Sequence, residues 1–155
     1  MRSAGQFFVA VLAVSTPAMA DDLHLVCRGS GTAIVTEVIG HADHSDVPNQ
    51  AAPNYAHRSM PFEDEVSVEI LDGTGRIRLP RSLLPPLHGG KEGWFELRKL
   101  KLGDTDITAA AAVNFYTAPK VRISRITGAI AIDGDDGIFS GQCQTFDPAT
   151  QKRQF

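Results

Sequence analysis

The chain has 155 residues and a formal net charge of −3, from 15 basic and 18 acidic side chains. A mildly acidic balance with mixed signs predicts no nucleic acid and no anionic membrane surface as partner, because both attract an excess of positive charge. The length is that of one ordinary domain, which is large enough to bury a core.

Residues 1–20 have the pattern of a cleaved signal peptide. Arg2 supplies the positive charge, residues 7–14 are apolar, and Ala18 to Ala20 form the small-x-small site that signal peptidase reads. A transmembrane anchor is disfavoured because the apolar run is shorter than the roughly 20 residues that span a bilayer. We therefore expect a periplasmic or secreted domain over 21–155, with no membrane span in the mature chain.

The beginning of this domain predicts two strands. Residues 23–28 alternate between apolar and polar positions, and residues 32–39 are rich in Thr, Val and Ile, which favour strands. Gly29-Ser30-Gly31 lies between them and lacks the spacing of a nucleophile elbow or a phosphate loop. We interpret the triplet as a turn.

Residues 40–60 are polar, contain prolines and show no periodicity, which predicts a long loop. His57 lies in this loop, together with a cluster of possible metal ligands: His41, Asp43, His44 and Asp46. Imidazole and carboxylate groups bind zinc or nickel, and two histidines three residues apart could reach one ion. The spacing matches no recognised metal signature, so a solvated loop is the alternative interpretation.

The middle of the chain predicts three more strands. Residues 62–70 alternate, with Asp64 as an exception on the apolar face, and residues 76–79 return after a turn at 72–75. A second long connection follows over 80–93, with one helical turn at 82–84 and with Leu83, Leu84 and Leu87 expected to plug an open end of the sheet. Residues 94–102 form a strand whose pattern slips near Arg98, which predicts a bulge.

The last third predicts a less regular strand over 106–115 and then a three-stranded meander. Its strands are 121–125, 129–133 and 138–144, with Gly128 and the Gly134–Gly137 segment at the turns. Small side chains at Ala109–Ala112 suggest a close approach of two sheets or a cavity wall. Residues 145–155 are polar, and we expect a frayed tail.

Cys27 and Cys143 are the only cysteines in the chain. An exported protein folds in an oxidising compartment, where an even pair of cysteines is normally joined. We predict a disulfide that brings the first and the last strand together. Two buried thiols or a redox pair are the alternatives, and the C-x-x-C spacing typical of a redox pair is absent.

Several segments resemble a group of short exported β-rich proteins of Gram-negative bacteria that have no assigned function. The resemblance rests on the signal peptide and on four motifs: Trp94-Phe95-x-Leu97, Ala111 to Phe115, Arg125-x-Thr127-Gly128 and Gly141-Gln142-Cys143. This chain has Ser124 where those proteins often carry Asp in an Ile-Asp-Arg segment. The resemblance implies a single small β domain and implies no activity.

The predicted fold is all-β, a small antiparallel barrel or sandwich of about eight or nine strands. An outer-membrane barrel is disfavoured because the strands are mostly too short and the aromatic residues too few.

Three functions stay open. The first is a non-enzymatic module that binds a small apolar ligand or an envelope partner; the second is a metal-binding protein that uses the His41–His57 segment; the third is a hydrolase, which would need a nucleophile and a base from distant strands.

Overall fold

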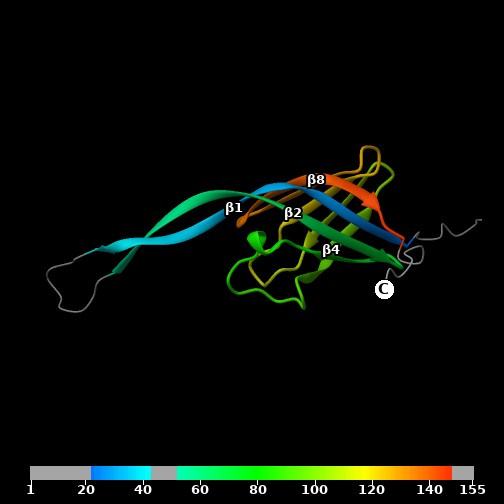
Figure 1. Cartoon of the computed structure of the whole chain (residues 1–155). Helices are drawn as coiled ribbons and strands as arrows, with labels where there is room; N and C mark the ends of the chain where they lie inside the picture. The colour runs from blue at the N-terminus through cyan, green and yellow to red at the C-terminus, as the bar shows by residue number, and fades with distance from the viewer. Residues whose placement is uncertain (1–21, 43–51, 148–155) are drawn as a thin grey trace, which may run out of the picture.

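The computed structural model describes residues 22–42 and 52–147. In these residues, eight antiparallel strands form one closed barrel in chain order, and β8 returns to pair with β1 (Figure 1). The strands are β1 (Leu23–Ala42), β2 (Ala52–Leu71), β3 (Thr74–Arg78), β4 (Trp94–Leu102), β5 (Asp106–Ala111), β6 (Lys120–Ser124), β7 (Ala129–Gly134) and β8 (Gly137–Thr145). The all-β prediction is confirmed. Of the two predicted architectures, barrel and sandwich, the structure has the barrel.

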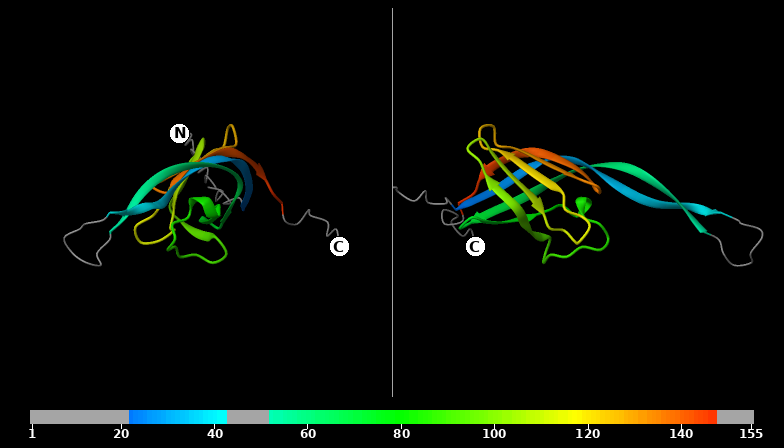
Figure 2. Two further views of the ribbon diagram at one scale, coloured as in Figure 1. Left: turned by 60° about the vertical axis from the view of Figure 1, so that its left-hand side comes forward. Right: turned by 180° about the vertical axis from the view of Figure 1, so that it is seen from behind.

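The first two strands are much longer than the others. β1 and β2 have 20 residues each, against 5 to 9 in the remaining strands. Their outer parts, residues 33–42 and 52–60, pair from Ala33↔Met60 to Ala42↔Ala52 and project from the barrel as a two-stranded ribbon (Figures 1 and 2). We call this ribbon the arm.

The predicted turn at Gly29-Ser30-Gly31 is wrong, because the triplet lies inside β1. A Cβ at Gly29 would collide with the backbone of Ser140, and one at Gly31 would come within 2.5 Å of the Phe62 ring. Glycine inside a strand marks such a close approach as well as a turn. The two glycines therefore let β1 approach β8 and let an aromatic ring lie against its backbone.

The predicted loop over 40–60 is also wrong for most of its length. Residues 52–60 belong to β2, and residues 40–42 belong to β1. Pro61 does not interrupt the strand, because Met60 and Phe62 direct their backbone groups to β1 and Pro61 faces the open edge. A proline there removes no ladder hydrogen bond. Long-range pairing thus overrides the weak local pattern.

The barrel interior is packed with apolar side chains, as an eight-stranded barrel allows. Fully buried members with less than about 3% exposure include Cys27, Val66, Val68, Ile70, Ile77, Phe95, Ile107, Ala111, Val113, Ile130, Ile132 and Phe139. The short 3₁₀ helix η1 (Arg81–Leu83) confirms the expected helical turn. It buries Leu83 against the core, whereas Leu87 is 84% exposed and plugs nothing.

Several local predictions are confirmed. The register of β4 against β5 shifts between Arg98 and Lys101, where the bulge was expected. Gly128 has a φ of 72° and donates its N–H to the Ser124 carbonyl at 2.9 Å, as the predicted β6–β7 turn requires. β5 ends at Ala111, short of the predicted 115.

The first residues of the predicted frayed tail, Thr145 and Phe146, pair with β1 instead. Thr145 is the last residue of β8, and the Phe146 N–H donates to the His24 carbonyl at 2.8 Å. Residues 148–155 lie outside the described residues.

Cys27 and Cys143 form the predicted disulfide, with Cα atoms 3.8 Å apart. They lie directly opposite each other on β1 and β8. The Cys143 N–H donates to Gly128 on the other side, at 2.8 Å, so Cys27 and Cys143 are a non-hydrogen-bonded pair. Such pairs are the narrow ones in an antiparallel ladder, which brings the two backbones close. The bridge joins the first strand to the last.

Candidate functional site

One end of the barrel carries the arm and the longest connections. In an up-and-down barrel every second connection lies at the same end, so the arm shares its end with loops 79–93 and 112–119 and with the β7–β8 turn (Figure 2). We call this the arm end. The shorter β2–β3, β4–β5 and β6–β7 connections lie at the other end. The helices of the described residues include none long and apolar enough to cross a membrane.

Exposed apolar side chains are concentrated at the arm end. Those exposed by 46% or more there are Ile34, Val38, Ile39, Tyr55, Met60, Leu87, Phe115, Tyr116 and Ile138. At the other end, Leu71, Leu102 and Phe146 are at most 42% exposed, and Ile126 alone reaches 77%. Clustered exposed apolar side chains are typical of interaction surfaces.

The most exposed aromatic pair stands on an ordered loop. Phe115 and Tyr116 are 93% and 88% exposed, and their rings meet edge to face with centroids 5.2 Å apart. Asn114 holds the loop in place: its Oδ1 accepts the N–H groups of Tyr116 and Thr117 at 2.8 and 2.6 Å, and its Nδ2 donates to the Leu87 carbonyl at 2.8 Å. The two rings are therefore presented in a defined position.

This aromatic pair was missed by the sequence reasoning, which placed Phe115 at the end of a strand. The available signal was Asn114 directly before two aromatic residues. An asparagine that bonds the backbone two or three residues ahead favours a turn.

The outer face of the arm carries a hydroxyl–imidazole contact. Thr36 Oγ1 lies 3.1 Å from His57 Nδ1, next along the ribbon to the exposed pair Val38 and Tyr55. A catalytic pair needs a third group that orients the base. Among the described residues no carboxylate contacts the His57 ring, and both side chains are open to solvent.

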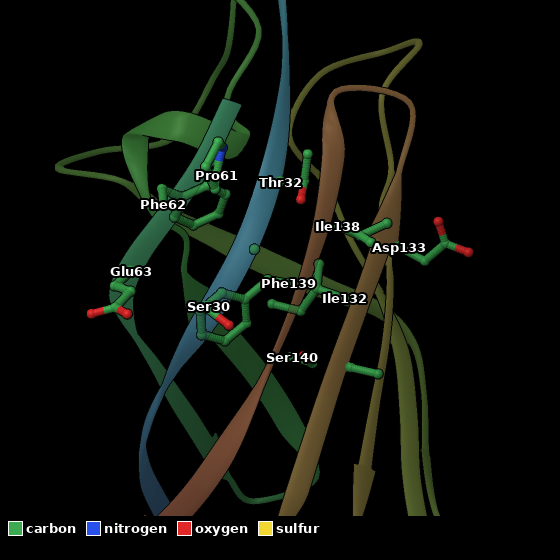
Figure 3. Close-up of a pocket in the computed structure, with 12 residues that line it drawn as sticks. Ser30, Thr32, Pro61, Phe62, Glu63, Ile132, Asp133, Ile138, Phe139 and Ser140 are labelled. Atoms are coloured by element: carbon green, nitrogen blue, oxygen red, sulfur yellow. The ribbon is translucent and has the colours of Figure 1, made fainter. Parts of the chain in front are cut away.

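A cleft of about 790 Å³ lies at the root of the arm, across β2, β1, β8 and β7 (Figure 3). Phe62 and Phe139 lie on either side of Gly31 in the register, and their rings stack with centroids 6.2 Å apart. The lining combines apolar side chains with hydroxyls and carboxylates: Pro61, Phe62, Ile132, Ile138, Phe139, Ser30, Thr32, Ser140, Glu63 and Asp133. The arrangement suits a molecule with both apolar and polar parts.

A second, polar cleft of about 770 Å³ lies between β2 and loop 79–93. Its charged lining consists of Asp64, Glu65, Arg78, Arg81, His88 and Glu92. Asp64 can point to the inner face because β3 pairs with β2 only from Ser67 onward, which leaves this part of the inner face open. The apparent exception in the strand pattern thus has a structural reason.

Asp136 in the β7–β8 turn contacts the root of the arm. Its carbonyl accepts the Ile34 N–H at 2.9 Å, and its Oδ2 is buried without a hydrogen-bond partner among the described residues. Burial, with a smaller contribution from the neighbouring Asp135, raises the pKa of the Asp136 carboxyl. The unsatisfied carboxylate opposes the close contact between turn and arm.

The structure does not describe the side chains of the predicted metal ligands. Asp43, His44 and Asp46 lie outside the described residues; of His41 only the backbone is described, where it pairs with Pro53. Within the described part of the chain, no three His, Cys, Asp or Glu side chains come together as a metal site.

Trp94, the first residue of β4, is half-buried, with the Arg76 guanidinium 4.7 Å from its ring centroid.

No protein-family model matches the chain, and neither a curated protein nor a solved structure matches it.

Proposed function

We propose that this chain is an exported, non-enzymatic binding module that engages a protein partner of the cell envelope with its arm end. The observation that carries the proposal is the aromatic pair Phe115–Tyr116, which is almost fully exposed on a loop held by Asn114. Exposed aromatic side chains lose contact with water when a partner binds, and ordering them beforehand reduces the entropic cost. Leu87, whose carbonyl accepts the Asn114 amide, is 84% exposed beside the pair and adds apolar surface to it.

Export is supported by the signal-peptide pattern of residues 1–20, and the disulfide is compatible with an oxidising location. The resemblance to exported β-rich proteins points the same way. Fractionation of producing cells should recover the protein outside the cytoplasm, and N-terminal sequencing should begin at Asp21. A protein that keeps Met1 in the cytoplasm would contradict the export part of the proposal.

Site-specific cross-linking tests the binding surface. A photoreactive amino acid in place of Phe115 should give adducts with an envelope protein in living cells. The matched control is Ile126, which is 77% exposed at the opposite end. Adducts at both positions, or at neither, would contradict a partner surface at the arm end.

A second candidate function is the binding of a small amphipathic molecule, and the cleft at the arm root favours it. Its volume of about 790 Å³ lies within the range of ligand sites. Native mass spectrometry of protein purified from the periplasm should then show a retained organic molecule. Ile138→Ser should reduce its occupancy, whereas Ile126→Ser, which is far from the cleft, should not.

A further inference from the structure

The polar cleft between β2 and loop 79–93 shares no lining residue with the cleft at the arm root. Its volume of about 770 Å³ lies within the range of small-molecule sites. One wall is the part of β2 that precedes Ser67, where the pairing with β3 begins. The other wall is formed by the end of β3, the helix η1 and the rest of the loop. A ligand in this cleft would therefore contact two separate parts of the chain.

The β2 wall offers two acceptors for a cation. Cys27 and Cys143 are a non-hydrogen-bonded pair, so Cys27 directs its backbone groups to its partner on β2, Val66. The carbonyl of the preceding residue, Glu65, therefore points away from β1, towards the cleft. Asp64 lies beside it: its Oδ1 accepts the Glu65 N–H at 2.7 Å, which leaves Oδ2 without a partner among the described residues.

The opposite wall offers two guanidinium groups. Arg78 is the last residue of β3 and Arg81 is the first residue of η1, and both side chains are exposed. Within the described part of the chain, neither side chain forms an ion pair or a hydrogen bond. Guanidinium groups bind carboxylates through paired hydrogen bonds. This wall therefore suits the carboxylate of a ligand.

The remaining ionisable groups of the cleft leave its unpaired charges balanced. The Glu65 carboxylate already accepts the Arg28 Nε–H at 3.1 Å, from outside the cleft. Glu92 lies on the loop wall and forms no ion pair with any described residue. With His88 neutral, the unpaired charges of the described lining are two carboxylates, Asp64 and Glu92, and the two guanidinium groups.

Hydrogen bonds hold the loop wall in position. The Leu79 N–H donates to the Gly93 carbonyl at 3.1 Å, and the Gly89 N–H donates to the Val113 carbonyl at 2.8 Å. The His88 Nδ1 donates to the Gly89 carbonyl at 2.8 Å, because a carbonyl can only accept. A wall that is ordered beforehand reduces the entropic cost of binding.

The opposite charges on the two walls select the class of ligand. No ion pair joins Asp64 to Arg78 or to Arg81, so the cleft keeps these charges apart. A purely anionic ligand would be repelled by the carboxylates, and a purely cationic ligand would be repelled by the guanidinium groups. A zwitterion meets an opposite charge on each wall, which is the complementarity that gives specificity.

We propose that this cleft binds a ligand with a free ammonium group and a free carboxylate group, as amino acids and short peptides have. The ammonium group donates hydrogen bonds to the Asp64 carboxylate and the Glu65 carbonyl. The ligand carboxylate accepts hydrogen bonds from Arg78 and Arg81. The half-buried Leu84, which also lines the cleft, supplies apolar contact for the rest of the ligand.

Isothermal titration calorimetry of the dialysed, disulfide-bonded protein with alanine, dialanine and trialanine tests the proposal. At least one of these compounds should bind saturably at one site per chain. The shortest compound that binds shows whether the source is a free amino acid or a peptide. The N-acetylated and the C-amidated forms of that compound each lack one charge, and each should bind at least about tenfold more weakly.

Two variants test the walls separately. Asp64→Asn keeps an acceptor for the Glu65 N–H but removes the charge, and Arg81→Gln removes one guanidinium group; each should weaken binding by about tenfold. Glu63→Gln and Lys91→Gln are the matched controls, because Glu63 and Lys91 lie on the same two segments but do not line the cleft. Both controls should bind as the unaltered protein does. Circular dichroism and the unfolding midpoint show whether each variant is folded.

The absence of saturable binding by all three compounds would overturn the proposal and leave the cleft as a solvated surface. Equal binding of the capped and uncapped compounds would also overturn it, and this comparison needs only the unaltered protein. Equal weakening by the control variants would contradict the assigned contacts. The site does not depend on the partner surface at Phe115, because cross-linking there can fail while the titration succeeds.

Discussion

At the residue scale, Gly31 shows how one position without a side chain lets β1 pack closely against β8 and against the Phe62 ring of β2. A Cβ there would meet the Ile138 carbonyl and come within 2.5 and 2.8 Å of two atoms of the Phe62 ring. We expect Gly31→Ala to lower the free energy of unfolding by about 1–3 kcal/mol, because overpacking forces side chains and backbone to shift. Denaturant unfolding measures this loss. Gly40→Ala is the control, since a Cβ there meets nothing within 4 Å and should cause little change; equal losses would contradict the explanation.

A second single residue, Asp136, makes the stability of the folded chain depend on pH. Burial and Asp135 raise the pKa of its carboxyl above the ordinary 3.8, so the folded chain binds this proton more tightly than the unfolded chain. The stabilising effect of protonation is present below 3.8 and is lost as the pH rises through the raised pKa. We expect Asp136→Asn to unfold at a higher temperature than the unaltered protein at neutral pH, with the difference vanishing in acid. Asp135→Asn should gain less, because it removes the smaller cause; a constant difference at all pH values would contradict this account.

At the element scale, the arm contributes exposed surface and the barrel contributes the core. Among the arm residues whose burial is described, only Ala33 is buried. Replacement of residues 34–59 by Asn-Gly would join Ala33 to Met60, a hydrogen-bonded pair that a two-residue hairpin turn can close. We expect this shortened protein to keep a cooperative unfolding transition within about 1 kcal/mol of the full chain, since little apolar burial is lost. Loss of cooperativity in denaturant unfolding would show that the arm is part of the folding unit.

At the scale of the whole molecule, the disulfide closes the barrel where its first and last strands meet. It links residues 116 apart, for which the chain-entropy model gives a stabilisation of at most about 4.7 kcal/mol. That is a large share of the roughly 5–15 kcal/mol typical of a domain. We expect the Cys27→Ser, Cys143→Ser double variant to unfold at a markedly lower denaturant concentration, and the denatured, unreduced protein to contain no titratable thiol. Two thiols per chain would refute the bridge.

The sequence by itself determined those features of the protein that arise from residues close together in the chain. The alternation in β2, the bulge in β4, the turn at Gly128 and the last three strands could be predicted, because side-chain periodicity and glycine conformation act over a few residues. The disulfide could be predicted from the cysteine count together with the predicted export.

Only the tertiary structure decided the features that depend on pairing between residues distant in the sequence. Gly29 and Gly31 have the composition of a turn, but in the barrel they let neighbouring strands and a ring come close to β1. Pro61 is typical of a loop, but it is tolerated in β2 because its backbone faces an edge that no strand covers. The strand over residues 52–60 exists because β1 lies beside it, and the arm end is a surface because long-range closure gathers its segments there.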